Sequence, residues 1–225
     1  IDHPWINKAL ERAQQKVEAR NFDIRKTLLK FDNVLNDQRQ VIFTQRNNIL
    51  NNDENNYVDD FLEEILINLI PSKNKFKSDP KGSNFLKSFK QIFGKSFYED
   101  ELNNIINMSD DDFKSSIKSK FNIKKLERIK YLGEKQNFEL EKRIFLQIID
   151  QNWKGHIQYL EQLRQVIGLR SYGNRDPLIE YKKEAFSLFE NLLNKLKNDL
   201  ITILLNLSVQ RVEKKNNNES LKKKI

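Results

Sequence analysis

The apolar side chains of the first fifty residues recur at the spacing of an α-helix. Two series of apolar residues step by seven: the first is Leu10, Val17, Ile24 and Phe31, and the second is Leu28, Leu35, Ile42 and Ile49. This period predicts one continuous helix over residues 1–50, with a length of roughly 65–70 Å at 1.5 Å per residue. Polar residues interrupt the apolar stripe, so we expect several different packing partners along the helix rather than a self-contained coiled coil.

Residues 51–122 have a less regular pattern. Short apolar clusters alternate with polar stretches such as PSKNKFKSDPKGSN at 71–84 and SDDD at 109–112. The pattern predicts three or four short helices and a basic loop. The stretch 51–120 carries 13 acidic and 10 basic side chains, which makes it the only net-acidic part of the chain.

A helical period returns after residue 122 and predicts two long helices. The first covers about Ile123 to Leu169, and the second begins at Asp176 and Pro177, a favourable pair for a helix N-terminus. Because only a short loop separates them, the two helices should run antiparallel. The predicted fold class is therefore all-α, with a long scaffold helix, a small irregular helical wing and a long antiparallel helical hairpin.

Composition excludes several functional classes. The 225 residues contain no cysteine and only two histidines, so disulfides and cysteine-based metal sites are excluded. The net charge of +8 raises the alternative of a basic helical nucleic-acid-binding or scaffold protein. Against that alternative, the basic residues are interspersed with acidic ones except in the lysine-rich end of the chain, residues 213–225, where the composition predicts a disordered tail.

The candidate catalytic and metal-binding patterns are weak. FGKS at 93–96 resembles the end of a phosphate-binding loop, but Phe89 stands where the first glycine is required. The acidic run 110–112 lacks the alternating ligands of a calcium loop and fits a helix N-terminus better. His156 follows Trp153 by three residues, which favours packing or hydrogen bonding over metal ligation. No catalytic, cofactor-binding or metal site is expected in this chain.

The segment LRSYGNRDP at 169–177 joins the two predicted helices of the hairpin. Tyr172 lies between Arg170 and Arg175, at the tip. Two interpretations are open from the residues alone: an ordinary connection, or an exposed aromatic with neighbouring cations that contacts a passing chain or a partner surface.

Three stretches resemble the C-terminal third of the SecA family, bacterial ATPases that drive preproteins through the SecY channel. They are residues 21–50, NFDIRKTLLKFDNVLNDQRQVIFTQRNNIL, residues 148–177, IIDQNWKGHIQYLEQLRQVIGLRSYGNRDP, and residues 180–193, EYKKEAFSLFENLL. The resemblance implies a helical scaffold at 1–50, a helical wing at 51–125, and a return scaffold helix with a two-helix finger at 126–212, whose tip is at about 170–176.

The resemblance also implies roles for individual residues. The fingertip residues that would contact the translocating polypeptide are Tyr172, Arg170 and Arg175. The polar residues of the scaffold helix that would face the motor domains are Asp32, Asn36, Asp37, Gln38 and Arg39. The sequence departs from the family pattern at Gly155, where a glutamate is usual, and at Ser171, where a glycine is usual.

The resemblance finally implies partners and a location. The chain would couple ATP hydrolysis, on motor domains that it does not contain, to the movement of an unfolded preprotein through the SecY channel complex. ATP and Mg would bind those motor domains, which make the full-length family ATP-dependent translocases. No specific nucleic acid is expected as a partner, while the lysine-rich tail could contact anionic lipid. The location would be the bacterial cytoplasm, peripheral at the inner membrane, and the initial Ile1 suggests a piece of a longer protein.

Overall fold

The structure is a computed structural model that describes residues 4–51, 56–79, 84–94, 96–173 and 176–208. These residues form seven α-helices and one 3-10 helix and contain no strand, which confirms the all-α prediction. The chain divides into two compact units. Unit 1 comprises residues 1–65 and 140–201, and unit 2 comprises residues 66–139 and 202–225.

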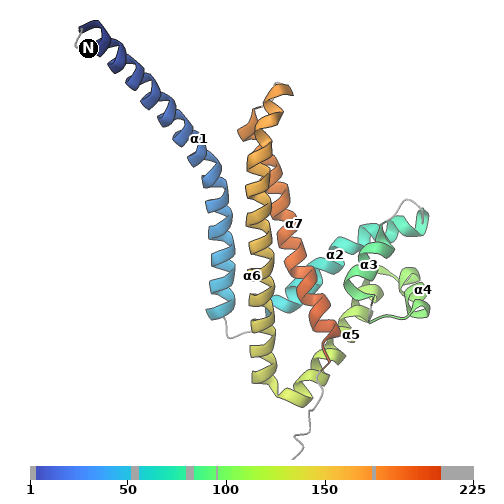
Figure 1. The fold of residues 1–225 in the computed structure, drawn as a ribbon. Coiled ribbons are helices and arrows are strands. Elements are labelled where there is room, and N and C mark those ends of the chain that lie inside the picture. Colours follow the sequence, from blue (N-terminus) through green and yellow to red (C-terminus); the bar gives the residue numbers. More distant parts are fainter. Residues whose placement is uncertain (1–3, 52–55, 80–83, 95, 174–175, 209–225) are drawn as a thin grey trace, which may run out of the picture. The chain divides into compact units, whose positions relative to one another are not determined.

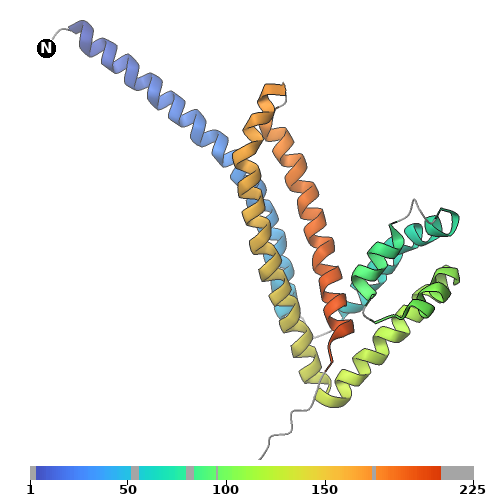
Figure 2. The ribbon, with the colours of Figure 1, turned by 45° about the vertical axis from the view of Figure 1, so that its right-hand side comes forward.

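Helix α1 is a single helix from Pro4 to Asn51, as the apolar period predicts. Its two halves differ in burial. The buried residues all lie in the second half, and they are Phe31, Gln38, Ile42 and Ile49. Every residue from 4 to 30 is exposed, and this part of α1 diverges from α6 in both views (Figures 1 and 2). The first half of α1 therefore carries an apolar stripe that faces solvent in this chain.

Helices α6 (Glu134–Ile167) and α7 (Pro177–Asn206) form the antiparallel hairpin. A 3-10 helix, η1 (Gly168–Gly173), lies between them. The part of the hairpin next to η1 packs on α1 through a cluster of buried residues: Phe31, Leu160, Leu163, Ile167, Tyr181 and Ala185. At its centre the rings of Phe31 and Tyr181 meet edge to face, with centroids 4.9 Å apart, an arrangement that aromatic quadrupoles favour. The predicted hairpin is confirmed.

The predicted helix over 123–169 is wrong in one respect, because it is interrupted at Gly133. Helix α5 runs from Asp110 to Leu132, and Gly133 follows it with φ of +83°. This conformation is accessible to glycine at little cost and allows the chain to leave α5 and start α6 at Glu134. The predicted boundary between the wing and the following region, at residues 125 and 126, falls inside α5.

Proline 71 does not end the preceding helix, contrary to the predicted loop at 71–84. Helix α2 continues through it, from Asn56 to Ser78. An interior proline costs a helix about 3 kcal/mol. Burial of side chains before and after the proline has to offset this cost. Leu69 and Lys73 are both buried, whereas Pro71 itself is exposed. Tertiary packing therefore overrides the local signal at this position.

Unit 2 also contains the short helices α3 (Phe85–Phe93) and α4 (Glu99–Asn107), which pack with α5 around a core rich in phenylalanine. The fully buried phenylalanines of these helices are Phe85, Phe89, Phe93, Phe113 and Phe121. Ser109 caps α5 by accepting a hydrogen bond from the Asp112 backbone amide at 3.1 Å, and Asp110 to Asp112 occupy its first turn. The acidic run is thus a helix N-terminus, as predicted.

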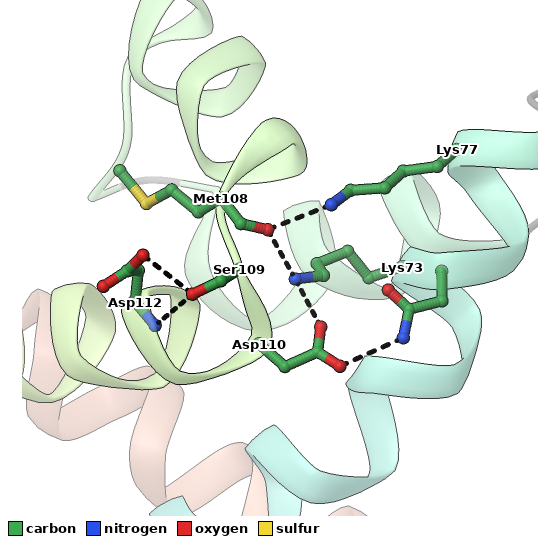
Figure 3. Close-up of polar contacts among 7 residues, drawn as sticks. Lys73, Lys77, Met108, Ser109, Asp110 and Asp112 are labelled. Carbon is green, nitrogen blue, oxygen red and sulfur yellow. Dashed lines mark hydrogen bonds and ion pairs between the residues drawn. The ribbon is translucent and has the colours of Figure 1, made fainter.

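A buried lysine ties α2 to the segment that joins α4 and α5 (Figure 3). The Lys73 side chain is 0% exposed, and its ammonium lies 2.7 Å from Asp110 Oδ1 and 3.1 Å from the Met108 carbonyl oxygen, to which it donates. Lys77 donates to the same carbonyl. The hydrogen bonds from Lys73 and Asn74 hold the pKa of Asp110 below its usual range. The Asp110 carboxylate therefore compensates a cation that could not otherwise be buried.

Within the described ranges, no helix combines the length and the apolar character that crossing a membrane requires. The same residues contain no cluster of three or more acidic or histidine side chains that could hold a metal ion.

Candidate functional site

The candidate site is the tip of the hairpin together with the surface of α1 on which the hairpin rests. At the tip, Asp176 starts α7. Its carboxylate accepts a hydrogen bond from the Leu178 amide at 2.8 Å, and its backbone carbonyl accepts one from the Glu180 amide at 3.1 Å. These are the contacts of a helix N-cap, so the predicted helix start at Asp176 and Pro177 is confirmed.

Arg170 connects η1 to the first turns of α7. Its guanidinium forms ion pairs with Glu184 and, at 3.1 Å, with Glu180. The hydrogen bond with Glu184 and the neighbouring negative charges raise the pKa of Arg170. Glu180 and Glu184 both belong to α7, so Arg170 fixes the base of the tip to the hairpin itself. Its predicted contact with a polypeptide stays a prediction.

The other two fingertip residues are less fully placed. Tyr172 lies in η1, but its side chain is outside the described part of the structure. Arg175 lies outside the described residues altogether. The role that the sequence assigns to them therefore stays a prediction.

The five polar residues predicted to face the motor domains do not share one environment. Asn36, Asp37 and Arg39 are exposed. Asp32 is exposed as well, and it pairs with Arg164 of α6 at 3.3 Å. Gln38 is different, since only 7% of it is exposed. It lies seven residues after Phe31, on the buried face of α1. The motor-facing role that the resemblance implies for these five residues stays a prediction.

Gln38 instead joins α1 to both helices of the hairpin. Its amide nitrogen donates to the Ala185 carbonyl of α7 at 3.0 Å, and its amide oxygen lies 2.8 Å from Nε2 of His156 on α6. With the amide in this orientation, His156 Nε2 carries the proton and donates it to Gln38. This assignment confirms the hydrogen-bonding role predicted for His156.

The surroundings of His156 favour its neutral form. The imidazole stacks on Trp153, with centroids 5.5 Å apart, and lies 5.9 Å from the ring of Phe189. Burial lowers the pKa of His156 from its usual value of 6.5, because a buried cation loses its hydration. The polar group formed by Gln38, His156 and the Ala185 carbonyl, here called the Gln38 clamp, is thus uncharged at neutral pH.

The lowered pKa predicts a pH dependence of stability. As the pH falls through 6.5, the unfolded chain protonates His156 more readily than the folded chain does, so stability decreases with falling pH. We expect the melting temperature to be constant above this range and to decline below it. The measurement is thermal unfolding by circular dichroism between about pH 5 and 8. His156→Gln, which keeps a donor for Gln38, should flatten that decline. An equal decline in both proteins would contradict the assignment.

Sequence reasoning missed the Gln38 clamp and the burial of Lys73. The position of Gln38 in the seven-residue series was the available signal, because a polar residue at a stripe position is buried if the helix packs there. No comparable signal identified the Ala185 carbonyl, which is a backbone group, or Arg128. In unit 2, Arg128 donates to Asn137 at 3.2 Å and to the Leu204 carbonyl near the end of α7.

These features define a class: an all-helical scaffold protein in which one long helix supports an antiparallel hairpin, with a second helical unit of short and medium helices. A comparison with known protein families identifies the family within this class. The family model described as the SecA wing and scaffold domain matches residues 1–208. The chain belongs to this SecA family.

Individual relatives agree with the family match. The chain is 61% identical to the protein translocase subunit SecA of Pelagibacter ubique strain HTCC1062, over 99% of its own length and 26% of the relative. It is 40% identical to SecA 1 of Nitrobacter hamburgensis, over 93% of its length and 22% of the relative. SecA of Wolbachia pipientis wMel is 40% identical over 88% of the chain and 23% of the relative. The chain thus spans about a quarter of the length of these relatives.

Proposed function

We propose that the chain is the scaffold and finger module of a SecA protein translocase, and that it couples ATP hydrolysis on separate motor domains to movement of an unfolded preprotein through the SecY channel. The observation that carries this proposal is the match of the family to residues 1–208, which include the α6–α7 hairpin seated on α1. The relatives are named protein translocase subunits. The role in coupling ATP hydrolysis to translocation goes beyond that name and is part of our proposal.

The geometry supports a mechanical role. Two packed helices resist bending, so a displacement at the base of the hairpin reaches η1 and Tyr172 with little loss. The exposed first half of α1 offers a separate apolar surface for the motor domains. A tyrosine at the tip suits a moving substrate of variable sequence, because its ring makes apolar contacts with any chain and its hydroxyl can exchange hydrogen bonds. The work would take place on the cytoplasmic side of the bacterial inner membrane.

The alternative of a nucleic-acid-binding protein rests only on the net charge of +8. Several of the cations in the described residues are neutralised by nearby carboxylates, as Lys73, Arg164 and Arg170 are. Interspersed pairs of this kind do not form the basic stripe that a phosphate backbone requires, so the translocase module is the better supported function.

Replacement of the tip aromatic tests the proposal. In a translocase assembled from this chain and the motor domains of the Pelagibacter relative, Tyr172→Ala should reduce preprotein translocation by about tenfold, equivalent to ~1.4 kcal/mol. ATP binding should be unchanged, because the motor domains are untouched. The measurement is the protection of a labelled preprotein inside SecY-containing vesicles.

Ser171→Ala is the matched control, since it alters the neighbouring tip residue without removing an aromatic ring. Tyr172→Phe should retain most of the activity if the ring makes the main contact. Full translocation by Tyr172→Ala would remove the fingertip role from the proposal.

A further inference from the structure

The buried stripe of α1 contains one polar residue. Its members are Phe31, Gln38, Ile42 and Ile49, separated by seven, four and seven residues. Burial of an amide in this stripe is unfavourable unless both of its polar atoms are hydrogen-bonded. Gln38 meets this condition, because its nitrogen donates to the Ala185 carbonyl and its oxygen accepts from His156.

The apolar residues of α1 do not by themselves specify where the helix sits on the hairpin. Sliding α1 by seven residues places Ile24 where Phe31 lies, Leu35 where Ile42 lies and Ile42 where Ile49 lies. Such a slide is about 10 Å long, at 1.5 Å per residue. It also places Phe31 at the position of Gln38. The shifted register would therefore bury an entirely apolar stripe, and hydrophobic burial alone does not disfavour it.

The Gln38 clamp distinguishes the two registers. In the shifted register Phe31 would face His156, and the buried imidazole N–H would lose its acceptor, which costs free energy. A slide in the opposite direction would move Gln38 to the site of Phe31, among Leu160, Leu163 and Tyr181, where apolar side chains surround it.

Other contacts between α1 and the hairpin contribute less to this choice. Arg46 pairs with Asp150 and Arg164 with Asp32, but the side chains of both aspartates are more than half exposed. Exposed ion pairs provide little net free energy because water solvates the separated charges almost as well. The buried hydrogen bonds of Gln38 are therefore the stronger determinant of register.

We infer that Gln38 is a positioning residue that fixes the register of α1 against the α6–α7 hairpin. A single buried amide has this role in coiled coils, where it selects one alignment at some cost in stability. With the register fixed, the second half of α1 and the hairpin move as one body. The consequence for translocation rests on the proposed function, whereas the register itself does not.

The test measures the distance between α1 and α7 in the 225-residue chain. Because the sequence contains no cysteine, spin labels can be attached at Asn36→Cys and Lys182→Cys, both at exposed positions. The chain with Gln38 should give one distance by pulsed electron resonance. Gln38→Leu leaves His156 without an acceptor in both registers, so the two should become comparable in free energy and a second distance should appear, consistent with a slide of about 10 Å.

Stability provides a second readout. Gln38→Leu alone leaves the buried His156 N–H without an acceptor and should lower the melting temperature. Replacing both hydrogen-bonding partners with apolar side chains can be nearly neutral, so the double variant Gln38→Leu with His156→Leu should lose register with little loss of stability. If Gln38 only stabilised the fold, its replacement would leave a single distance in both variants. Gln40→Leu, which makes the same kind of change at an exposed position, should behave as the parent chain.

The double variant Gln38→Leu with His156→Leu covers the case in which Gln38→Leu does not fold. It removes the unpaired imidazole together with the amide, and it should fold with two distances. A single unshifted distance in whichever of these variants folds would overturn the inference. None of these measurements depends on motor domains, so their failure is distinguishable from failure of the proposed function.

Discussion

Lys73→Ala should destabilise unit 2 by about 3 kcal/mol, the order of loss expected when a long, fully buried side chain is truncated to alanine. The side chain of Lys73 is 0% exposed, and its ammonium also lies 4.9 Å from the centre of the Phe113 ring. Truncation would remove the buried stem and leave a cavity beside the aromatic core. It would also remove the charged link between α2 and the start of α5.

Hydrogen exchange of the amides of α2 to α5 is the direct measurement, because it reports on unit 2 separately from unit 1. A loss of 3 kcal/mol corresponds to exchange roughly a hundredfold faster or more where exchange requires the unit to unfold. Lys75→Ala is the control, since Lys75 is exposed on the same helix and its replacement should have an effect within about 0.5 kcal/mol.

Lys73→Met separates packing from charge. Methionine retains an apolar stem of similar length, and solvent can still hydrate Asp110, whose side chain is 44% exposed. The methionine variant should therefore lose less stability than the alanine variant. If Lys73→Ala exchanged no faster than Lys75→Ala, the buried side chain of Lys73 would not support unit 2.

Disruption of the exposed stripe on α1 should abolish docking of the chain on SecA motor domains. Val17 and Ile24 are 58% and 49% exposed and lie seven residues apart on one face. Burying each against a partner would contribute about 1.5–3 kcal/mol. We therefore expect Val17→Asp with Ile24→Asp to weaken binding by at least about a hundredfold, or ~2.8 kcal/mol.

The control has to add the same charge on the opposite side of the helix. Gln15→Asp with Ala19→Asp does so, since both residues lie roughly half a turn from Val17 and Ile24. Binding can be measured by titration calorimetry with the motor portion of the Pelagibacter relative. Equal binding by both double variants would show that the stripe is not the docking surface.

The long helices could be predicted because the apolar spacing that indicates them repeats many times along the sequence. The boundaries of α1 and the N-terminus of α7 followed from a sustained apolar period and from Asp176 with Pro177. A stripe of side chains, however, does not show which of its members are buried. Phe186 and Ile203 belong to the apolar series of α7, yet they are 62% and 40% exposed, because the buried face is set by what packs there.

The errors arose where one residue carries opposing signals. Pro71 opposes helix locally, but the burial of Leu69 and Lys73 keeps α2 continuous. Gly133 was one glycine within a helical period, and only its φ of +83° shows that α5 ends there. Gln38 belongs to the polar run by which the chain resembles the SecA family, but its seven-residue spacing from Phe31 places it on the buried face.

The most direct test of the coupling role is the ATPase rate of the motor portion of the Pelagibacter relative, measured with and without the 225-residue chain. If the chain docks as a scaffold and regulates the motor, it should bind and lower the basal rate. Circular dichroism of the same sample would report whether the added chain is helical. A rate unchanged by a folded, helical chain at saturating concentration would contradict the account.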